Sequence, residues 1–200
     1  MNDHLPFATV GQTIGLLGGS FDPPHQGHLH ISRQALRQFR LDRVWWLVSP
    51  GNPLKKDSPA DFQRRMAASH ALVDHPKIAV TDIEMHLKTR RTAETLARLT
   101  PRYPGVRFVW LMGADNLAGF HKWENWRVIM TQMPIGVLGR PENGVRAGSS
   151  PAARAFAQYR LPSSLSVTLP YQSPPCWCLV NGPTVDISST QIRNNGQWVR

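Results

Sequence analysis

The sequence predicts an α/β protein built on a doubly wound parallel sheet with helices on both faces. Short apolar runs alternate along the chain with amphipathic stretches. Strands that alternate with helices predict parallel βαβ units, and these units place helices over both faces of the sheet. The length of 200 residues fits one domain over residues 1–200, in which we expect residues 1–11 to form a flexible N-terminal extension.

Three strand–helix pairs are predicted in the first half of the chain. Each strand is a short apolar run, and each helix carries apolar residues at helical spacing. Asp61 can cap the second helix, and Pro101 ends the third. In order, we predict a strand over 13–17, a helix over 28–39, a strand over 44–48, a helix over 62–73, a strand over 78–81 and a helix over 92–99.

The second half continues this alternation and then becomes less regular. Residues 140–150 are rich in Pro, Gly and Ser and predict a loop, after which Pro151 suits the first position of a helix. In order, we predict a strand over 106–112, a helical turn over 113–120, a helix over 124–130, a strand over 135–138, a helix over 151–159, weak strands over 167–169 and 177–180, and a helix start over 188–193.

The composition favours anionic partners, which include nucleotides, nucleic acid and acidic membrane surfaces, without choosing among them. Lysine and arginine outnumber aspartate and glutamate by 23 to 13, which gives a formal net charge of +10. The basic residues are dispersed, so we expect a solvated basic surface and no nucleic-acid partner. No signal peptide and no apolar run of the ~20 residues that span a bilayer are found, so we expect a cytoplasmic protein without a membrane partner. Cys176 and Cys178 are expected to be buried, reduced thiols.

The most informative stretch is Gly18-Gly19-Ser20-Phe21-Asp22-Pro23-Pro24-His25-Gln26-Gly27-His28, between the first strand and the first helix. Glycines let the backbone approach a phosphate closely, and the free N–H groups of a helix start point at the anion. His25 and His28 add side-chain donors. The spacing fits neither Gly-x4-Gly-Lys-Ser/Thr nor Gly-x-Gly-x-x-Gly, so it predicts phosphate chemistry of another kind.

This stretch resembles the nucleotidyltransferase signature Gly-Gly-Ser/Thr-Phe-Asp-Pro-x-His-x-Gly-His. That family transfers an adenylyl or cytidylyl group from a nucleoside triphosphate. A second stretch, Ile187-Ser188-Ser189-Thr190-Gln191-Ile192-Arg193, is similar to the family's Ile-Ser-Ser/Ala-Thr-x-Ile-Arg. Two motifs in the expected order favour this family over a Gly/Pro-rich turn with solvated histidines. The resemblance implies a Rossmann-like fold.

The resemblance also implies an ATP site. His25 and His28 would lie against the phosphates and stabilise the transition state, whereas His30 is expected to be solvated. Asp22 is expected to accept hydrogen bonds from backbone N–H groups of its own turn, and an approach to the second substrate is the alternative. Mg²⁺ is expected to accompany ATP, and the metal ligands are left unknown. The residues implied to bind ATP are Gly18, Gly19, Ser20, His25, His28, Asp115, Ser188, Ser189 and Arg193.

The middle of the chain resembles the nicotinate-mononucleotide adenylyltransferase branch of this family. Residues 113–126 fit the pattern Gly-x-Asp-x-Leu-x-x-Phe-x-x-Trp-x-x-Trp. The resemblance implies that Trp123 stacks on the pyridine ring of the mononucleotide, and we expect Trp126 to pack in the core. The residues implied to bind the mononucleotide are Lys55, Lys56, Thr92, Trp123 and Arg140.

The sequence thus predicts adenylyl transfer from ATP to nicotinate mononucleotide, giving deamido-NAD and pyrophosphate. Arg91 stands where the family often has an aromatic residue, which leaves nicotinamide mononucleotide open as the acceptor. Phosphopantetheine is a further alternative, although it has no aromatic ring for Trp123 to face. A non-catalytic, basic nucleic-acid-binding protein on the same scaffold is the alternative from another class, and a homo-oligomer stays open.

Overall fold

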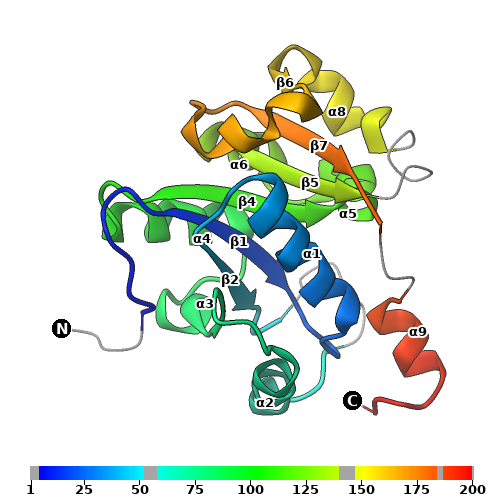
Figure 1. The fold of residues 1–200 in the computed structure, drawn as a ribbon. Helices are drawn as coiled ribbons and strands as arrows, with labels where there is room; N and C mark the ends of the chain where they lie inside the picture. The colour runs from blue at the N-terminus through cyan, green and yellow to red at the C-terminus, as the bar shows by residue number, and fades with distance from the viewer. Residues whose placement is uncertain (1–4, 52–57, 140–146, 184–186, 200) are drawn as a thin grey trace.

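The structure, a computed structural model, describes residues 5–51, 58–139, 147–183 and 187–199. Within these residues a seven-stranded sheet has the order β3-β2-β1-β4-β5-β7-β6, and the neighbouring strands pair in parallel (Figure 1). This confirms the predicted doubly wound α/β fold. The strands are β1 (Thr13–Gly19), β2 (Arg43–Val48), β3 (Ile78–Thr81), β4 (Arg107–Gly113), β5 (Ile135–Gly139), β6 (Arg160–Leu161) and β7 (Trp177–Asn181).

Several helices begin at residues whose side chains cap them. Asp61 accepts a hydrogen bond from Arg64 N at 3.1 Å, and Ser150 accepts one from Ala153 N at 3.3 Å, just before Pro151. The α-helices are α1 (Gln26–Gln38), α2 (Phe62–Leu72), α3 (Ile83–His86), α4 (Thr92–Leu99), α5 (Ala114–Gly119), α6 (Trp126–Gln132), α8 (Pro151–Ala155) and α9 (Ser189–Asn194). The 3₁₀ segments are η1 (Thr100–Arg102), η2 (Phe120–Lys122), η3 (Ala157–Tyr159) and η4 (Ser163–Tyr171).

Each face of the sheet carries its own apolar core. Successive residues of one strand enter different cores. Trp45 belongs to the core formed with the helices α3 to α6 and α8, and Trp46 belongs to the core formed with α1 and η4. Figure 1 shows α1 across one face of the sheet, with α4 and α6 on the other side. Burial on both faces explains why the strands are apolar runs rather than alternating ones.

The strand order reverses between β1 and β4. The chain builds β1, β2 and β3 outward in one direction and then returns to place β4 on the other side of β1. The segments that follow β1 and β4 lead to α1 and α5, which cover opposite faces, so a crevice opens at the carboxyl ends of these two strands. The glycine-rich motif, at the end of β1, lies at this crevice.

Three details differ from the sequence-based expectation. The weak strand predicted over 167–169 is wrong, because these residues belong to the 3₁₀ segment η4, which follows Pro162 and contains Pro170. A proline nitrogen cannot donate a hydrogen bond to a neighbouring strand. The short elements α3 and β6 were not expected. Residues 140–146 of the predicted loop lie outside the described residues.

The described part of the N-terminal segment lies against the rest of the chain. Leu5 and Ala8 pack on the α4–α6 side of the sheet, and the Tyr103 hydroxyl donates a hydrogen bond to Pro6 O at 2.8 Å. The cysteines are buried free thiols, as predicted, and burial raises the pKa of Cys178 to about 11. Among the described residues, no helix combines the length and apolar character needed to cross a membrane.

A buried hydrogen bond between side chains joins α1 to β2. Trp46 Nε1 donates to Ser32 Oγ at 2.7 Å, and both residues are fully buried. We expect Ser32→Ala to lower the free energy of unfolding by about 1–3 kcal/mol, because the indole N–H loses its acceptor away from water. Urea denaturation measures this change. The double variant Ser32→Ala/Trp46→Phe should lose less than the sum of the two single changes, and strict additivity would contradict the prediction.

Candidate active site

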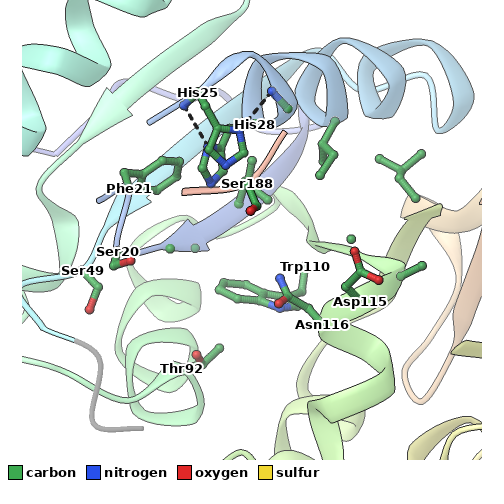
Figure 2. Close-up of a pocket in the computed structure, with 18 of the residues that line it drawn as sticks. Ser20, Phe21, His25, His28, Ser49, Thr92, Trp110, Asp115, Asn116 and Ser188 are labelled. Carbon is green, nitrogen blue, oxygen red and sulfur yellow. Dashed lines mark hydrogen bonds between the residues drawn. The ribbon is translucent and has the colours of Figure 1, made fainter. Parts of the chain in front are cut away.

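The crevice at the strand-order reversal is a pocket of about 710 Å³. One wall comes from the glycine-rich motif and the start of α1, and the facing wall comes from β4 and the first turn of α5 (Figure 2). Most of the sequence-predicted site residues that the structure describes line this pocket. They are Gly18, Gly19, Ser20, His25, His28, Thr92, Asp115, Trp123 and Ser188.

The two histidines form the cap of α1. His25 Nδ1 accepts a hydrogen bond from Gly27 N at 3.1 Å, and His28 Nδ1 accepts one from His25 N at 3.2 Å. This reciprocal pair is a capping box in which imidazoles replace the usual hydroxyl and carboxyl groups. The imidazole rings lie with their centroids 3.8 Å apart, and the Phe21 ring lies 4.7 Å from that of His28. These hydrogen bonds therefore fix both imidazole rings at the N-terminus of α1.

These hydrogen bonds assign the tautomer of each imidazole. A nitrogen that accepts from a backbone N–H carries no proton, so the proton of each neutral ring resides on Nε2. Burial lowers the pKa of His25 from 6.5 to about 4, which keeps this ring neutral at neutral pH. The site therefore presents N–H donors of defined orientation rather than mobile positive charges.

Two glycines of the motif are required by close packing. A Cβ at Gly18 would lie 2.4 Å from Trp110 Cη2, and a Cβ at Gly27 would lie 2.8 Å from His25 Nδ1. The absence of a side chain at Gly18 lets the Trp110 ring lie directly against the end of β1. The absence of one at Gly27 lets the His25 ring fold onto the helix start. Both glycines thus shape the pocket walls as well as the turn.

A buried arginine holds the loops beside the pocket. Arg65 of α2 is 1% exposed and donates to Ser20 O at 2.6 Å, Ser49 O at 2.7 Å and Ala60 O at 2.8 Å. Burial lowers the pKa of Arg65, and the charges of Asp22 and Asp61 oppose this shift. One guanidinium therefore fixes the loops that follow β1 and β2 relative to each other.

The other end of the pocket lies at α4 and η2. Thr92 is the first residue of α4, and Trp123 follows η2, with its ring edge-to-face against Phe120 at 5.2 Å and Trp110 at 6.5 Å. Arg91 pairs with Glu124, and both line the pocket. Trp126, predicted to be a core residue, is 8% exposed and packs against Phe120.

A buried glutamate of α3 also reaches the pocket wall. Glu84 is 4% exposed, and its Oε1 accepts a hydrogen bond from Thr95 Oγ1 at 3.3 Å. Burial raises the pKa of Glu84 to about 7, against a smaller opposite effect of the Ser49 and Thr95 hydroxyls. The carboxyl is therefore divided between its neutral and charged forms near neutral pH.

The second motif is divided between the pocket and the turn beside it. Ser188 caps α9 by accepting from Gln191 N at 3.2 Å, and it lines the pocket. Ser189 Oγ instead donates to Pro23 O at 2.9 Å. Arg193 donates to Asp22 O, and it also donates to Thr190 Oγ1 at 3.1 Å. Ser189 and Arg193 thus contact the first motif, and their assignment to ATP stays a prediction.

Of the remaining predicted site residues, the structure describes Asp115 alone. Asp115 lies in the first turn of α5, on the pocket wall. Lys55, Lys56 and Arg140 lie outside the described residues. Within the described part of the chain, no cluster of three His, Cys, Asp or Glu residues could hold a metal ion.

Comparisons with known proteins agree with this architecture. The sequence profile of the family described as Cytidylyltransferase-like matches residues 16–195. The chain belongs to this family. It is 60% identical over 185 residues to a protein of Cereibacter sphaeroides named a probable nicotinate-nucleotide adenylyltransferase, with 92% of this chain and 98% of that protein covered. A protein of the same name from Ruegeria pomeroyi is 57% identical over 198 residues, with 99% of this chain and 93% of that protein covered.

A solved structure shows the same fold at low sequence identity. It is the nicotinic acid mononucleotide adenylyltransferase of Plasmodium falciparum, complexed with NaAD. The TM-score is 0.68 at 18% identity, over 92% of this chain and 83% of that one. The family profile and the relatives confirm the nucleotidyltransferase resemblance, and the solved structure confirms the Rossmann-like fold that it implies.

Sequence reasoning gave no role to several pocket residues of this cytidylyltransferase-like chain. Sequence patterns placed Trp110 in an apolar strand and Ser49 just after one, with no role in a site for either residue. His30, expected to be solvated, lines the pocket with its Nε2 2.5 Å from Pro183 O. Glu84 carried no signal beyond a charge between two apolar neighbours. These roles depend on tertiary packing, which local patterns do not report.

The raised pKa of Glu84 predicts a specific pH dependence of stability. Between pH 4.5 and about 7 the folded state keeps a proton that the unfolded chain has lost, so this residue lowers stability as pH rises through that window. We expect Glu84→Gln to gain on the order of 3 kcal/mol in free energy of unfolding, relative to the unaltered protein, across the window. Urea denaturation of both proteins at each pH measures the difference, which would be constant if the Glu84 pKa were ordinary.

Proposed function

We propose that this chain transfers the adenylyl group of ATP to nicotinate mononucleotide, giving deamido-NAD and pyrophosphate. One observation carries the proposal: the pocket that presents two fixed imidazole N–H donors also contains a partly exposed tryptophan, Trp123. Phosphate chemistry needs the first feature, and recognition of a pyridine ring uses the second. The names of the relatives at 55–60% identity support the same activity.

The reaction is an in-line displacement at phosphorus. A phosphate oxygen of the mononucleotide attacks the α-phosphorus of ATP, and the bond from that phosphorus to the oxygen bridging to the β-phosphate breaks. The electron pair leaves with pyrophosphate, so no protein nucleophile is required. Negative charge builds on the non-bridging and leaving oxygens, and catalysis rests on positioning and electrostatic stabilisation.

His25 and His28 supply that stabilisation. Their Nδ1 atoms accept the capping hydrogen bonds of α1, so Nε2–H is the group of each ring that would donate to phosphate oxygens. Because the cap holds the rings, little reorganisation is needed as charge develops. Ser188, at the start of α9, adds a polar group on the same pocket wall.

Mg²⁺ would arrive with ATP, bound mainly by the triphosphate. This ion usually takes one or two protein carboxylates and keeps its other positions for phosphates and water. Asp115, on the pocket wall, has a carboxylate of the kind that ligates Mg²⁺. When bound, Mg²⁺ would neutralise charge on the leaving pyrophosphate.

The α4 end of the pocket suits the nicotinate ring. Trp123 offers an indole face, and Thr92 offers a hydroxyl and the start of an eight-residue helix for a carboxylate. Arg90 lines the same end, and its positive charge favours the anionic nicotinate over the neutral nicotinamide, whereas Arg91 is paired with Glu124. The roles of Lys55, Lys56 and Arg140 toward the mononucleotide phosphate, the cytoplasmic location and a homo-oligomeric state stay predictions.

The reaction is tested by pyrophosphate release with ATP and Mg²⁺. We expect strong release with nicotinate mononucleotide and much less with nicotinamide mononucleotide or phosphopantetheine. His28→Ala should lower the rate by on the order of 10²–10³-fold, because a preorganised donor to the developing charge is lost. Preference for another acceptor would overturn the assignment of the α4 end, and salt-sensitive RNA binding without turnover would favour the non-catalytic alternative.

The proposed stacking of Trp123 on the pyridine ring is tested by the variant Trp123→Ala. We expect KM for nicotinate mononucleotide to rise roughly ten- to a hundredfold, because stacking on an aromatic ring is lost. KM for ATP should stay within about threefold, since the two ligands contact different ends of the pocket. Trp123→Phe serves as the matched control and should recover part of the affinity. An equal rise in KM for both substrates would contradict the assignment of Trp123 to the pyridine ring.

A further inference from the structure

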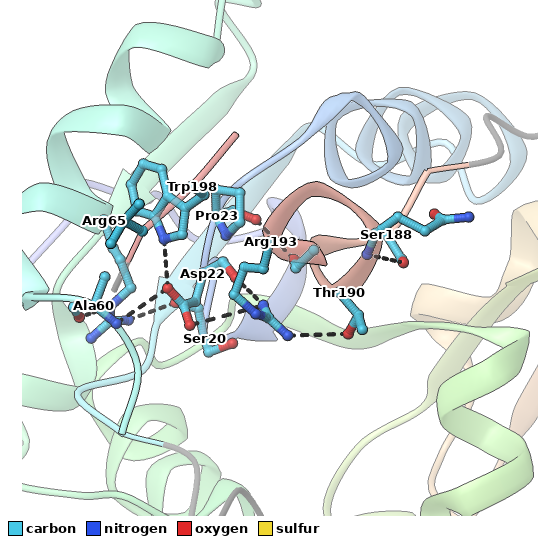
Figure 3. Close-up of polar contacts among 12 residues, drawn as sticks. Ser20, Asp22, Pro23, Ala60, Arg65, Ser188, Thr190, Arg193 and Trp198 are labelled. Carbon is cyan, nitrogen blue, oxygen red and sulfur yellow. Dashed lines mark hydrogen bonds and ion pairs between the residues drawn. The ribbon is translucent and has the colours of Figure 1, made fainter. Parts of the chain in front are cut away.

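The carboxylate of Asp22 is the centre of a polar cluster outside the pocket (Figure 3). Asp22 belongs to the first motif, is 0% exposed and does not line the pocket. Its Oδ1 accepts hydrogen bonds from Trp198 Nε1 at 2.8 Å and from Ala60 N at 3.2 Å. Its Oδ2 lies 3.9 Å from Arg193 Nη1. Three segments that are distant in the sequence therefore meet on one buried side chain.

Trp198 is held from two sides. Its indole N–H is bound to Asp22, and the guanidinium of Arg64 lies 4.1 Å from the centroid of its ring. Arg64 also donates to Val199 O. The segment after α9, which Gly196 turns away from the helix at a φ of +71°, thus returns to α2 and the first motif.

We propose that Trp198 is a positioning residue for the phosphate end of the pocket. It holds the Asp22 carboxylate, and this carboxylate orients Arg193, which also binds the Asp22 backbone carbonyl. Together with the hydrogen bond from Ser189 Oγ to Pro23 O, these contacts hold α9 against the turn that leads to His25. Ser188, at the start of α9, thereby keeps its place on the pocket wall beside the histidines.

The direction of the coupling follows from the charges. A buried carboxylate is stabilised only while its hydrogen bonds and its opposite charges stay in place. Removal of the Trp198 N–H leaves Asp22 short of a donor, so Asp22, Arg193 and the start of α9 must rearrange together. The consequence is expected at the ATP phosphates and not at the α4 end, where Thr92 and Trp123 line the pocket.

The inference rests on the proposed function only in naming ATP as the ligand, and direct ATP binding tests it without turnover. We expect Trp198→Phe, which keeps an aromatic ring for Arg64, to weaken ATP binding roughly tenfold, the scale of one hydrogen bond to a charged group. Equilibrium dialysis with labelled ATP measures this. In the pyrophosphate assay, KM for ATP should rise while KM for nicotinate mononucleotide stays within about twofold.

Trp177→Phe is the matched control. Trp177 also donates a hydrogen bond from its Nε1, to Phe156 O at 2.8 Å, but it does not line the pocket or contact Asp22. This variant should bind ATP as the unaltered protein does, even where its melting temperature falls. Equal ATP affinity of Trp198→Phe and the unaltered protein would overturn the inference, as would an equal loss in both variants. Failure of nicotinate mononucleotide to support pyrophosphate release would instead overturn the proposed function alone.

Discussion

The site depends on one constraint: the first turn of α1 uses imidazole nitrogens as its caps. A helix start has N–H groups that need acceptors, and His25 and His28 supply two of them with Nδ1. The same bonds decide which nitrogen of each ring carries the proton and in which direction the ring lies. Helix capping through Nδ1 and the proposed ligand recognition through Nε2 thus depend on the same two imidazole rings, and neither can be changed without the other.

The fold supplies the second requirement, a place where this helix start is open to a ligand. Because strand order reverses between β1 and β4, their helices cover opposite faces and leave the strand ends uncovered. Trp110 of β4 then packs on Gly18 of β1, which closes the floor of the crevice without filling it. Arg65 holds the loops above this floor through backbone carbonyls, so the fixing does not depend on the side chains of those loops.

Sequence reasoning worked best where a pattern is local. The βαβ alternation, the cap at Asp61, the helix start over 188–193 and the histidine turn were predicted because each is encoded within a short stretch of sequence. The strand over 167–169 was wrong, since three apolar or β-branched residues between prolines suit a 3₁₀ segment equally well. Arg65, Glu84 and Trp198 were missed for a different reason: burial of a charge, or contact across 176 positions, is a property of the folded chain.

The position of Asp22 resolves an apparent conflict within the first motif. A carboxylate in a turn proposed to bind phosphate should repel ATP, since like charges at close range oppose binding. The structure turns this side chain away from the pocket and surrounds it with Arg193, the charge of Arg65 and neutral N–H donors. Gly19 and Ser20, just before Asp22 in the same turn, line the pocket. The acid therefore organises cationic residues behind Gly19 and Ser20, where their positive charge offsets its own negative charge.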